Sequence, residues 1–132
     1  MPPSRSLRWG VFVVGLDPTV GHEQQATRRA LVVSYEPYHQ SENATICPIT
    51  AAYSVPRYPT EVAIPEGEAG QTLPGIILCQ QMRTVSLLRI QSLKDYLTNP
   101  SIRAAVRGAI AHHLGLDLLP VNDGANGNAV FR

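Results

Sequence analysis

The sequence predicts a mainly β fold of the α+β type, with a small antiparallel barrel or coiled sheet and one long C-terminal helix. Three observations support this fold class. Five short runs rich in Val and Ile alternate with turn-forming residues, prolines fall between these runs, and the apolar residues change to a helical period near the C-terminus. With 132 residues, the chain has the length of a single domain with one core.

The five runs are the predicted β-strands. They cover residues 9–14, 30–34, 45–49, 61–64 and 75–79, and each is bounded by Gly, Pro, Asn or Ser. A proline cannot donate to a β-ladder, so it belongs between strands, as do Pro37, Pro56, Pro59, Pro65 and Pro74. Residues 87–97 allow two interpretations, either a sixth strand through residues 87–90 or a short helical turn.

The segment after Asn99 is predicted to be an amphipathic helix of about four turns. Asn99 suits the N-cap position, Pro100 the first helical position and Gly115 the C-terminal stop. The residues at helical spacing are Ile102, Ala105, Val106, Ala109, Ile110, His113 and Leu114. Residues 119–132 have little to bury and are predicted to form a flexible C-terminal tail, which leaves residues 1–118 as the folded domain.

The charge balance limits the function classes. A formal net charge of +1 with 16% charged residues excludes both a polycationic nucleic-acid coat and a disordered acidic chain. An anionic partner must therefore be bound by a local patch. Lys94 is the only lysine among eleven cationic residues, and the Arg guanidinium binds phosphate through two parallel hydrogen bonds. Codon usage in a GC-rich genome would explain the same excess of Arg.

Cysteine and histidine usage indicates a reduced, metal-free protein. Cys47 and Cys79 lie in apolar runs, where free cysteine behaves as a small hydrophobic residue; a disulfide between neighbouring strands is the alternative. His112 and His113 are adjacent on the predicted helix and point in different directions, so they do not form a metal site. No stretch approaches the roughly 18 apolar residues of a membrane span, so we expect a soluble cytoplasmic protein without cofactor.

Three polar segments could meet at one rim of a small antiparallel sheet. The first is the loop with His22, Glu23 and Gln24 that leads to Arg28 and Arg29; the second is the strand end at Thr50; the third contains Gln80, Gln81, Arg83 and Thr84. Guanidiniums could neutralise a phosphate, hydroxyls could donate to its oxygens, and a carboxylate or imidazole could move protons. Taken singly, each residue also fits a structural role, such as a surface ion pair or a turn.

Four ordered motifs point to a known family. The first is Asp17-Pro18-Thr19-Val20-Gly21-His22-Glu23-Gln24, followed by Arg28 and by Leu31-Val32-Val33-Ser34. The others are Cys47-Pro48-Ile49-Thr50, Tyr58-Pro59-Thr60-Glu61-Val62 and Ile77-Leu78-Cys79-Gln80-Gln81-Met82-Arg83-Thr84-Val85. With a C-terminal helix ending in Leu114-Gly115-Leu116, residues 8–118 resemble the MazF/PemK (Kid) toxins of type II toxin–antitoxin systems.

This resemblance implies an SH3-like barrel of the CcdB/PemK type that forms a homodimer. It also implies a metal-independent, sequence-specific endoribonuclease, or mRNA interferase, acting on single-stranded RNA in the prokaryotic cytoplasm. Attack by the ribose 2′-hydroxyl would leave a 2′,3′-cyclic phosphate and a 5′-hydroxyl, and growth would arrest. A cognate MazE-like antitoxin, which forms a DNA-binding complex with such toxins, would fill the RNA groove with an acidic and hydrophobic tail.

The resemblance also assigns roles to residues of this chain. Arg28 matches the motif arginine, Thr50 the catalytic threonine that contacts the phosphate, and Glu23 lies where some members need an acidic residue. An arginine side chain stays protonated at neutral pH, so Arg28 fits a stabiliser of the phosphorane or a proton donor, whereas His22 or Glu23 is the more natural base. The predicted RNA-binding residues are His22, Gln24, Arg29, Gln81, Arg83 and Thr84.

The chain departs from the family pattern at several positions. Arg29 replaces a common proline, Trp9-Gly10 replaces Gly followed by an acidic residue, Gly15 replaces an Asp, and Gln80 takes a position that is frequently acidic. Two alternatives remain: a gyrase poison of the CcdB type, which shares the fold but ends its helix in an aromatic tip, and an inactive barrel that only binds a partner. The Arg28 and Thr50 motifs favour the nuclease.

Overall fold

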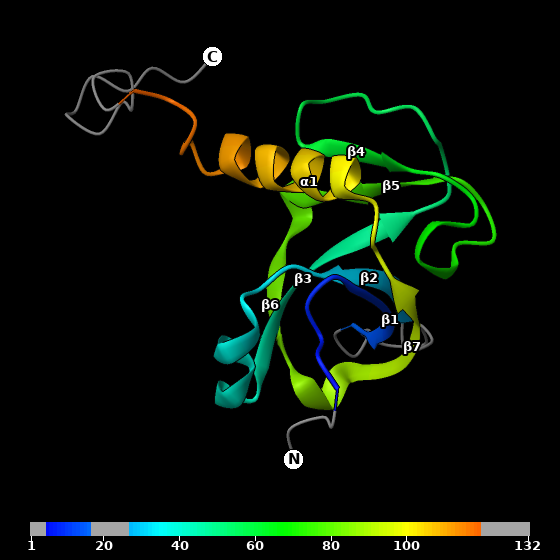
Figure 1. Cartoon of the computed structure of the whole chain (residues 1–132), viewed down its shortest axis with the longest axis vertical. Coiled ribbons are helices and arrows are strands. Elements are labelled where there is room, and N and C mark those ends of the chain that lie inside the picture. Colours follow the sequence, from blue (N-terminus) through cyan, green and yellow to red (C-terminus); the bar gives the residue numbers. More distant parts are fainter. Residues whose placement is uncertain (1–4, 17–26, 120–132) are drawn as a thin grey trace, which may run out of the picture.

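The structure is a computed structural model that describes residues 5–16 and 27–119, and these residues form one sheet with a single α-helix (Figure 1). Seven antiparallel strands make up the sheet in the order β4-β5-β3-β2-β1-β7, and β6 pairs with β3 beside this path. The strands are β1 (Gly10–Gly15), β2 (Thr27–Val32), β3 (Asn43–Thr50), β4 (Glu61–Ile64), β5 (Gly75–Leu78), β6 (Arg83–Ser86) and β7 (Ile90–Tyr96).

Strand β3 joins the two halves of the sheet. It pairs with β6 through Ile46 and with β5 from Ile49 onward, and Pro48, which has no N–H to donate, lies between the two partners. The half with β1, β2, β6 and β7 curls into a barrel-like form, whereas β4 and β5 extend the other half beneath the helix (Figure 1). Within the described residues the pairing path is open between β4 and β7, so the predicted small barrel is an open one.

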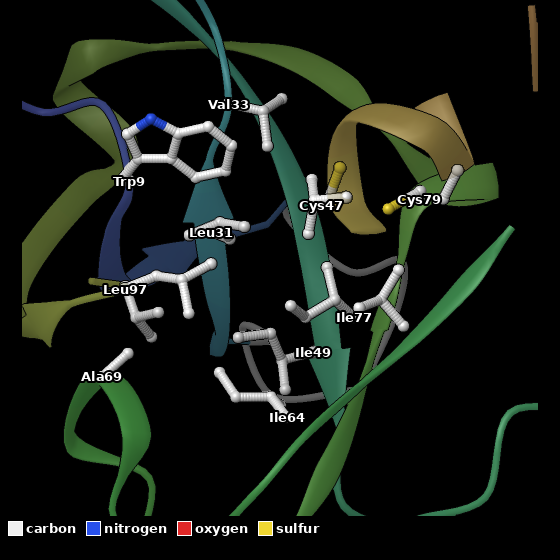
Figure 2. Close-up of a cluster of buried hydrophobic side chains, with 14 residues drawn as sticks. Trp9, Leu31, Val33, Cys47, Ile49, Ile64, Ala69, Ile77, Cys79 and Leu97 are labelled. Carbon is white, nitrogen blue, oxygen red and sulfur yellow. The ribbon is translucent and has the colours of Figure 1, made fainter. Parts of the chain in front are cut away.

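Both faces of the central strands are buried. In β1, Val11 belongs to one cluster of buried side chains and Phe12 to the other, and in β2 Leu31 and Val32 divide in the same way. This division follows from the alternation of side chains along a strand. The cluster with Val11 lies between the sheet and the helix (Figure 2), and the cluster with Phe12 lies inside the curl.

Helix α1 (Pro100–His113) begins as the sequence predicts. The Asn99 side chain accepts hydrogen bonds from the backbone N–H groups of Ser101 and Ile102, at 2.9 and 3.1 Å, and Gly115 follows the helix with a φ of +71°. Val106 and Ala109 are buried. The prediction was wrong for Ala105, His113 and Leu114, which are exposed because the apolar stripe that packs on the sheet is narrower than the sequence pattern.

Trp9 connects the helix to the first strand. Its indole is almost completely buried, and the guanidiniums of Arg8, Arg103 and Arg107 lie 5.3, 5.1 and 5.1 Å from the ring centroid. Its φ of +68° is unusual for a bulky residue. Two backbone bonds hold this conformation: the Trp9 N–H donates to the Val32 carbonyl at 2.8 Å, and its carbonyl accepts from Leu97 at 2.7 Å.

All five predicted strands are present, with ends shifted by up to three residues, but β6 was missed. Residues 87–97, for which a sixth strand through residues 87–90 and a short helical turn were the two interpretations, contain both: Leu87–Arg89 form the 3-10 turn η4, and the strand β7 starts only at Ile90. Three further 3-10 turns are η1 (Glu36–Ser41), η2 (Glu68–Gly70) and η3 (Cys79–Gln81). The predicted tail lies outside the described residues, apart from Leu119.

The two cysteines are free thiols in the core, as predicted. Their sulfur atoms face each other between β3 and η3 (Figure 2), and a hydrogen bond with Cys79, together with burial, raises the pKa of Cys47. In the part of the chain that the structure describes, no helix has the length and apolarity required to span a membrane.

Candidate active site

A pocket of about 400 Å³ opens where the ends of several strands meet. Antiparallel pairing brings these ends together, since Thr50 of β3 lies opposite Ile76 of β5 and Glu61 of β4 lies opposite Leu78 of β5. The start of β2, the loop between β3 and β4, and η3 complete the wall. The lining residues are Arg28, Thr50, Tyr53, Arg57, Tyr58, Glu61, Leu78, Gln80 and Gln81.

Arg28 enters the pocket from the second position of β2. Its Nη2 donates to the Ile49 carbonyl at 3.4 Å, which places the guanidinium beside the end of β3. A guanidinium has five N–H donors in a fixed plane, so this single bond leaves donors for an anion in the pocket. The side chain is therefore anchored and still able to bind a phosphate.

Thr50 is the last residue of β3. Its Oγ1 accepts a hydrogen bond from the backbone N–H of Ala52 at 3.1 Å, which fixes the position of the oxygen. Accepting this bond leaves the hydroxyl proton to donate. Thr50 can thus give a hydrogen bond to an oxygen of a ligand held by Arg28.

Glu61 is a buried carboxylate at the first position of β4. It accepts hydrogen bonds from the Tyr53 hydroxyl at 2.8 Å, the Arg57 backbone N–H at 2.9 Å and Gln80 Nε2 at 2.9 Å. Burial raises the pKa of Glu61, but these three donors and the charge of Arg57 outweigh it and hold that pKa below its ordinary value. Glu61 is therefore ionised at neutral pH and fits a structural anchor better than a proton acceptor.

Arg57 and Tyr53 form a stacked pair on the wall of the pocket. The Arg57 Cζ lies 3.6 Å from the centroid of the Tyr53 ring. Tyr58, next to Arg57 in the same loop, is 62% exposed. The lining of the pocket thus combines Arg28 and Thr50 with the stacked Tyr53–Arg57 pair and Tyr58.

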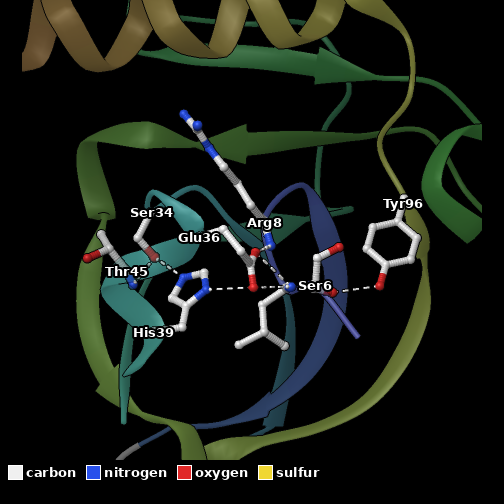
Figure 3. A network of polar contacts seen from close by, with 8 residues as sticks. Ser6, Arg8, Ser34, Glu36, His39, Thr45 and Tyr96 are labelled. Atoms are coloured by element: carbon white, nitrogen blue, oxygen red, sulfur yellow. Dashed lines mark hydrogen bonds and ion pairs between the residues drawn. The ribbon is translucent and has the colours of Figure 1, made fainter. Parts of the chain in front are cut away.

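A second polar cluster lies among η1, β3 and the start of the chain (Figure 3). His39 is buried, its Nε2 lies 2.7 Å from Ser34 Oγ, and its Nδ1 lies 3.3 Å from the Glu36 carboxylate. The order Ser–His–Glu is that of a hydrolase triad, but Ser34 Oγ already accepts from the Thr45 N–H at 2.9 Å. Glu36 accepts from the backbone of Leu7 and Arg8 at 2.8 to 3.1 Å, so the cluster fastens the N-terminal segment to η1.

Comparison with known families identifies the family to which the chain belongs. The family described as "PemK-like, MazF-like toxin of type II toxin-antitoxin system" matches residues 7–114, which include the seven strands and α1. The chain belongs to this family.

Relatives named as endoribonucleases, which are PemK, ChpB, EndoA and MazF, are similar to this chain at 26–36% identity. Endoribonuclease PemK of Escherichia coli is 31% identical over 81 residues, which are 61% of this chain and 60% of the relative, less than two thirds of its length. Endoribonuclease EndoA of Bacillus subtilis is 32% identical over 93 residues, or 70% of this chain and 78% of the relative. The solved structure of a MazE–MazF complex from Deinococcus radiodurans superposes with a TM-score of 0.67 at 28% identity and covers 83% of this chain and 95% of that one.

The pocket of this PemK/MazF-family chain contains some of the residues that the sequence singled out. Arg28, Thr50, Gln80 and Gln81 line it. His22, Glu23 and Gln24 lie outside the described residues. The catalytic and RNA-binding roles assigned to all of these residues stay predictions.

Three of the predicted RNA-binding residues lie elsewhere. Arg29 Nη1 donates to the Gly70 carbonyl at 2.8 Å and to Gln71 Oε1 at 3.2 Å, which ties β2 to η2. Thr84 Oγ1 lies 2.9 Å from Thr45 Oγ1 across β6 and β3. Arg83, the residue before Thr84 in β6, lies opposite Ile46 of β3. These three residues do not line the pocket, because β2 alternates its side chains and β6 follows the curled half of the sheet.

Sequence reasoning gave no role to four of the nine residues that line the pocket. Tyr53, Arg57, Tyr58 and Glu61 come from the loop between β3 and β4 and the residue that follows it. Tyr58 and Glu61 belong to one of the four motifs that carry the resemblance, but neither residue was given a role. The available signal was a loop with two Tyr and an Arg that ends in a carboxylate at the start of a β-strand.

Proposed function

We propose that this chain is the toxin of a type II toxin–antitoxin system and cleaves single-stranded RNA without a metal ion. The observation that carries the proposal is the convergence of the Arg28 guanidinium and the Thr50 hydroxyl on one pocket. Relatives named as endoribonucleases support it, because the aligned family spans residues 7–114.

The proposed reaction is an internal transfer within RNA. The ribose 2′-oxygen forms a bond to the neighbouring phosphorus while the bond from phosphorus to the 5′-oxygen breaks. The 2′-hydroxyl proton goes to a base, for which Glu23 or His22 is the candidate, and the leaving 5′-oxygen gains a proton. Arg28 and Thr50 would stabilise the charge on the phosphorane oxygens, leaving a 2′,3′-cyclic phosphate and a 5′-hydroxyl.

The biological setting follows from the family and is part of the proposal. We expect residues 1–118 to form the toxin domain, which acts as a homodimer in the cytoplasm of a prokaryote, with residues 119–132 as its tail. A MazE-like antitoxin would inhibit it, as the MazE–MazF complex of Deinococcus radiodurans suggests. Free toxin would then arrest growth by cutting mRNA.

The test is cleavage of a long single-stranded RNA in EDTA. Wild type should produce discrete cuts with cyclic-phosphate ends, and Arg28→Ala and Thr50→Ala should abolish them, whereas Arg29→Ala, away from the pocket, should cut normally. Intact RNA after incubation with folded wild-type protein would contradict the proposal and favour a CcdB-like or binding-only role.

A further inference from the structure

Part of the pocket lining has a composition that phosphate binding does not require. Tyr53, Arg57 and Tyr58 present two aromatic rings and a guanidinium within one loop. Tyr58 is 62% exposed although it lines a pocket, so it does not serve the hydrophobic core. Flat aromatic and guanidinium surfaces of this kind stack with unpaired bases in single-stranded nucleic acids.

The loop that carries these side chains is held in place. The Glu61 carboxylate binds the Tyr53 hydroxyl and the Arg57 backbone N–H, so it fixes one member of the stacked pair by its side chain and the other by its backbone. The Arg57 guanidinium then lies 3.6 Å from the Tyr53 ring. A surface ordered before binding loses less conformational entropy when a ligand stacks on it.

Amide groups in the same pocket could read the edge of a base. Glu61 also holds Gln80 Nε2 at 2.9 Å, and the Oε1 of this amide has no hydrogen-bond partner in the described part of the chain. Gln81 is exposed and lines the pocket too. An amide both donates and accepts, as the edges of the nucleobases do. The volume of about 400 Å³ lies within the range of pockets that hold small ligands, about 300 to 1,000 Å³.

We propose that Tyr53, Arg57 and Tyr58 form a nucleobase-binding subsite beside Arg28 and Thr50. One unpaired base stacks on this surface, with Gln81 at its edge and Glu61 as the positioning residue. The inference rests on the proposed RNA-cleaving function and deepens it, because the subsite selects the nucleotide at one position near the cut. Stacking on such a surface contributes roughly 5- to 150-fold in affinity per base.

The experiment has a cleavage arm and a binding arm. In the cleavage arm, a pool of RNAs randomised around the cleavage site is incubated with wild type, Tyr58→Ala, Tyr58→Phe or Arg57→Ala. In the binding arm, the affinity of each protein is measured for a 2′-O-methyl oligonucleotide, which cannot react because its 2′-oxygen is capped. Tyr35→Ala is the matched control, since Tyr35 is 68% exposed and lies at the start of η1. Thermal unfolding verifies that each variant is folded.

We expect Tyr58→Ala and Arg57→Ala to weaken oligonucleotide binding at least fivefold, raise KM, and flatten the nucleotide preference at one position, whereas Tyr35→Ala behaves as wild type. Tyr58→Phe keeps the aromatic ring and should restore most of the binding that Tyr58→Ala loses. Unchanged affinity and preference in both alanine variants, with an active wild type, would overturn the subsite alone. If wild type binds the oligonucleotide in a Tyr58-dependent way but does not cut RNA, the cleavage function alone would be overturned. Folded wild type that neither cuts nor binds RNA would overturn both.

Discussion

Arg28 and Arg29 are consecutive residues of β2, yet their guanidiniums lie on different sides of the strand. Arg28 reaches the Ile49 carbonyl and the pocket, while Arg29 reaches the Gly70 carbonyl of η2 and the side chain of Gln71, which follows η2. The alternation of a β-strand gives the two residues different tasks. This pair offers a matched comparison of a binding residue with a structural one.

Arg28→Ala should lower the rate of RNA cleavage by about 10²- to 10³-fold, the usual cost of losing one donor to a developing anion. The fold should change little, because Arg28 makes one long hydrogen bond to the protein. Arg28→Lys should recover only part of the rate, since an ammonium cannot bind a phosphate through a planar fork. Single-turnover kinetics would measure these rates, and full activity of Arg28→Lys would count against bidentate phosphate contact.

Arg29→Ala should have the opposite profile. Two hydrogen bonds to η2 disappear, so the free energy of unfolding should fall by about 1 to 2 kcal/mol, while the cleavage rate stays near that of wild type. Urea unfolding and the same kinetic assay would measure both quantities. A large loss of activity in a stable Arg29→Ala protein would show that Arg29 contacts RNA directly.

Gly75→Ala should reduce both stability and activity. A Cβ at this position would lie 2.5 Å from the Thr50 carbonyl oxygen, so β5 or the end of β3 must move. Crowding of this kind costs about 1 to 3 kcal/mol, and it displaces Thr50. Gly108→Ala is the control: its Cβ would have no neighbour within 4 Å, and alanine in a helix interior should stabilise the protein by about 0.5 to 1 kcal/mol. Equal stability and activity of the two variants would contradict the crowding argument.

Glu36 should make the fold sensitive to acid. Burial raises its pKa, but backbone hydrogen bonds from Arg8 and Leu7 and the contact with His39 lower it below the ordinary 4.5. The ionised carboxylate therefore stabilises the fold above pH 4.5, and this contribution is lost as the pH falls through the lower folded-state pKa. Urea unfolding from pH 7 to pH 3 should show a smaller loss of stability in Glu36→Gln than in wild type. Parallel curves for the two proteins would exclude this role.

Cys47 and Cys79 should be unreactive in the native protein. Both thiols are buried, and the raised pKa of Cys47 keeps it protonated, whereas the thiolate is the reactive form. A thiol reagent such as DTNB should label neither cysteine in buffer and both in denaturant. Rapid labelling of native protein would indicate that this part of the core opens, and an absence of labelling in denaturant would indicate a disulfide.

The sequence predicted those helices and strands whose residue pattern matches their burial in the fold. The Asn99 cap, the following proline and Gly115 marked the helix, and the strands with Val and Ile on both faces gave continuous apolar runs. Strand β7 could not be separated from a helical turn because its half-buried residues, Ile90, Leu93 and Tyr96, recur at every third position and its pairing with β1 is irregular, so neither a continuous run nor a strict alternation remained. Strand β6 has four residues, of which only Val85 is buried, so it lacks the apolar run that marked the equally short β4 and β5.

The site was predicted only in part, for a physical reason. Arg28 and Thr50 stand in motifs at the ends of strands, where a resemblance can assign them. The Tyr53–Glu61 hydrogen bond and the stack of Arg57 on Tyr53 depend on how the loop after β3 folds back on β4. Such contacts leave no periodic pattern in the sequence, because they form only when the loop folds.

The position of Trp9 has a practical consequence. It is the only tryptophan of the chain, and two of the three guanidiniums around it, those of Arg103 and Arg107, come from α1. Its fluorescence emission therefore reports the packing around the indole, which includes the attachment of this helix to the sheet. Changes in emission wavelength and quenching can follow the helix during unfolding or on addition of a partner, without any attached dye.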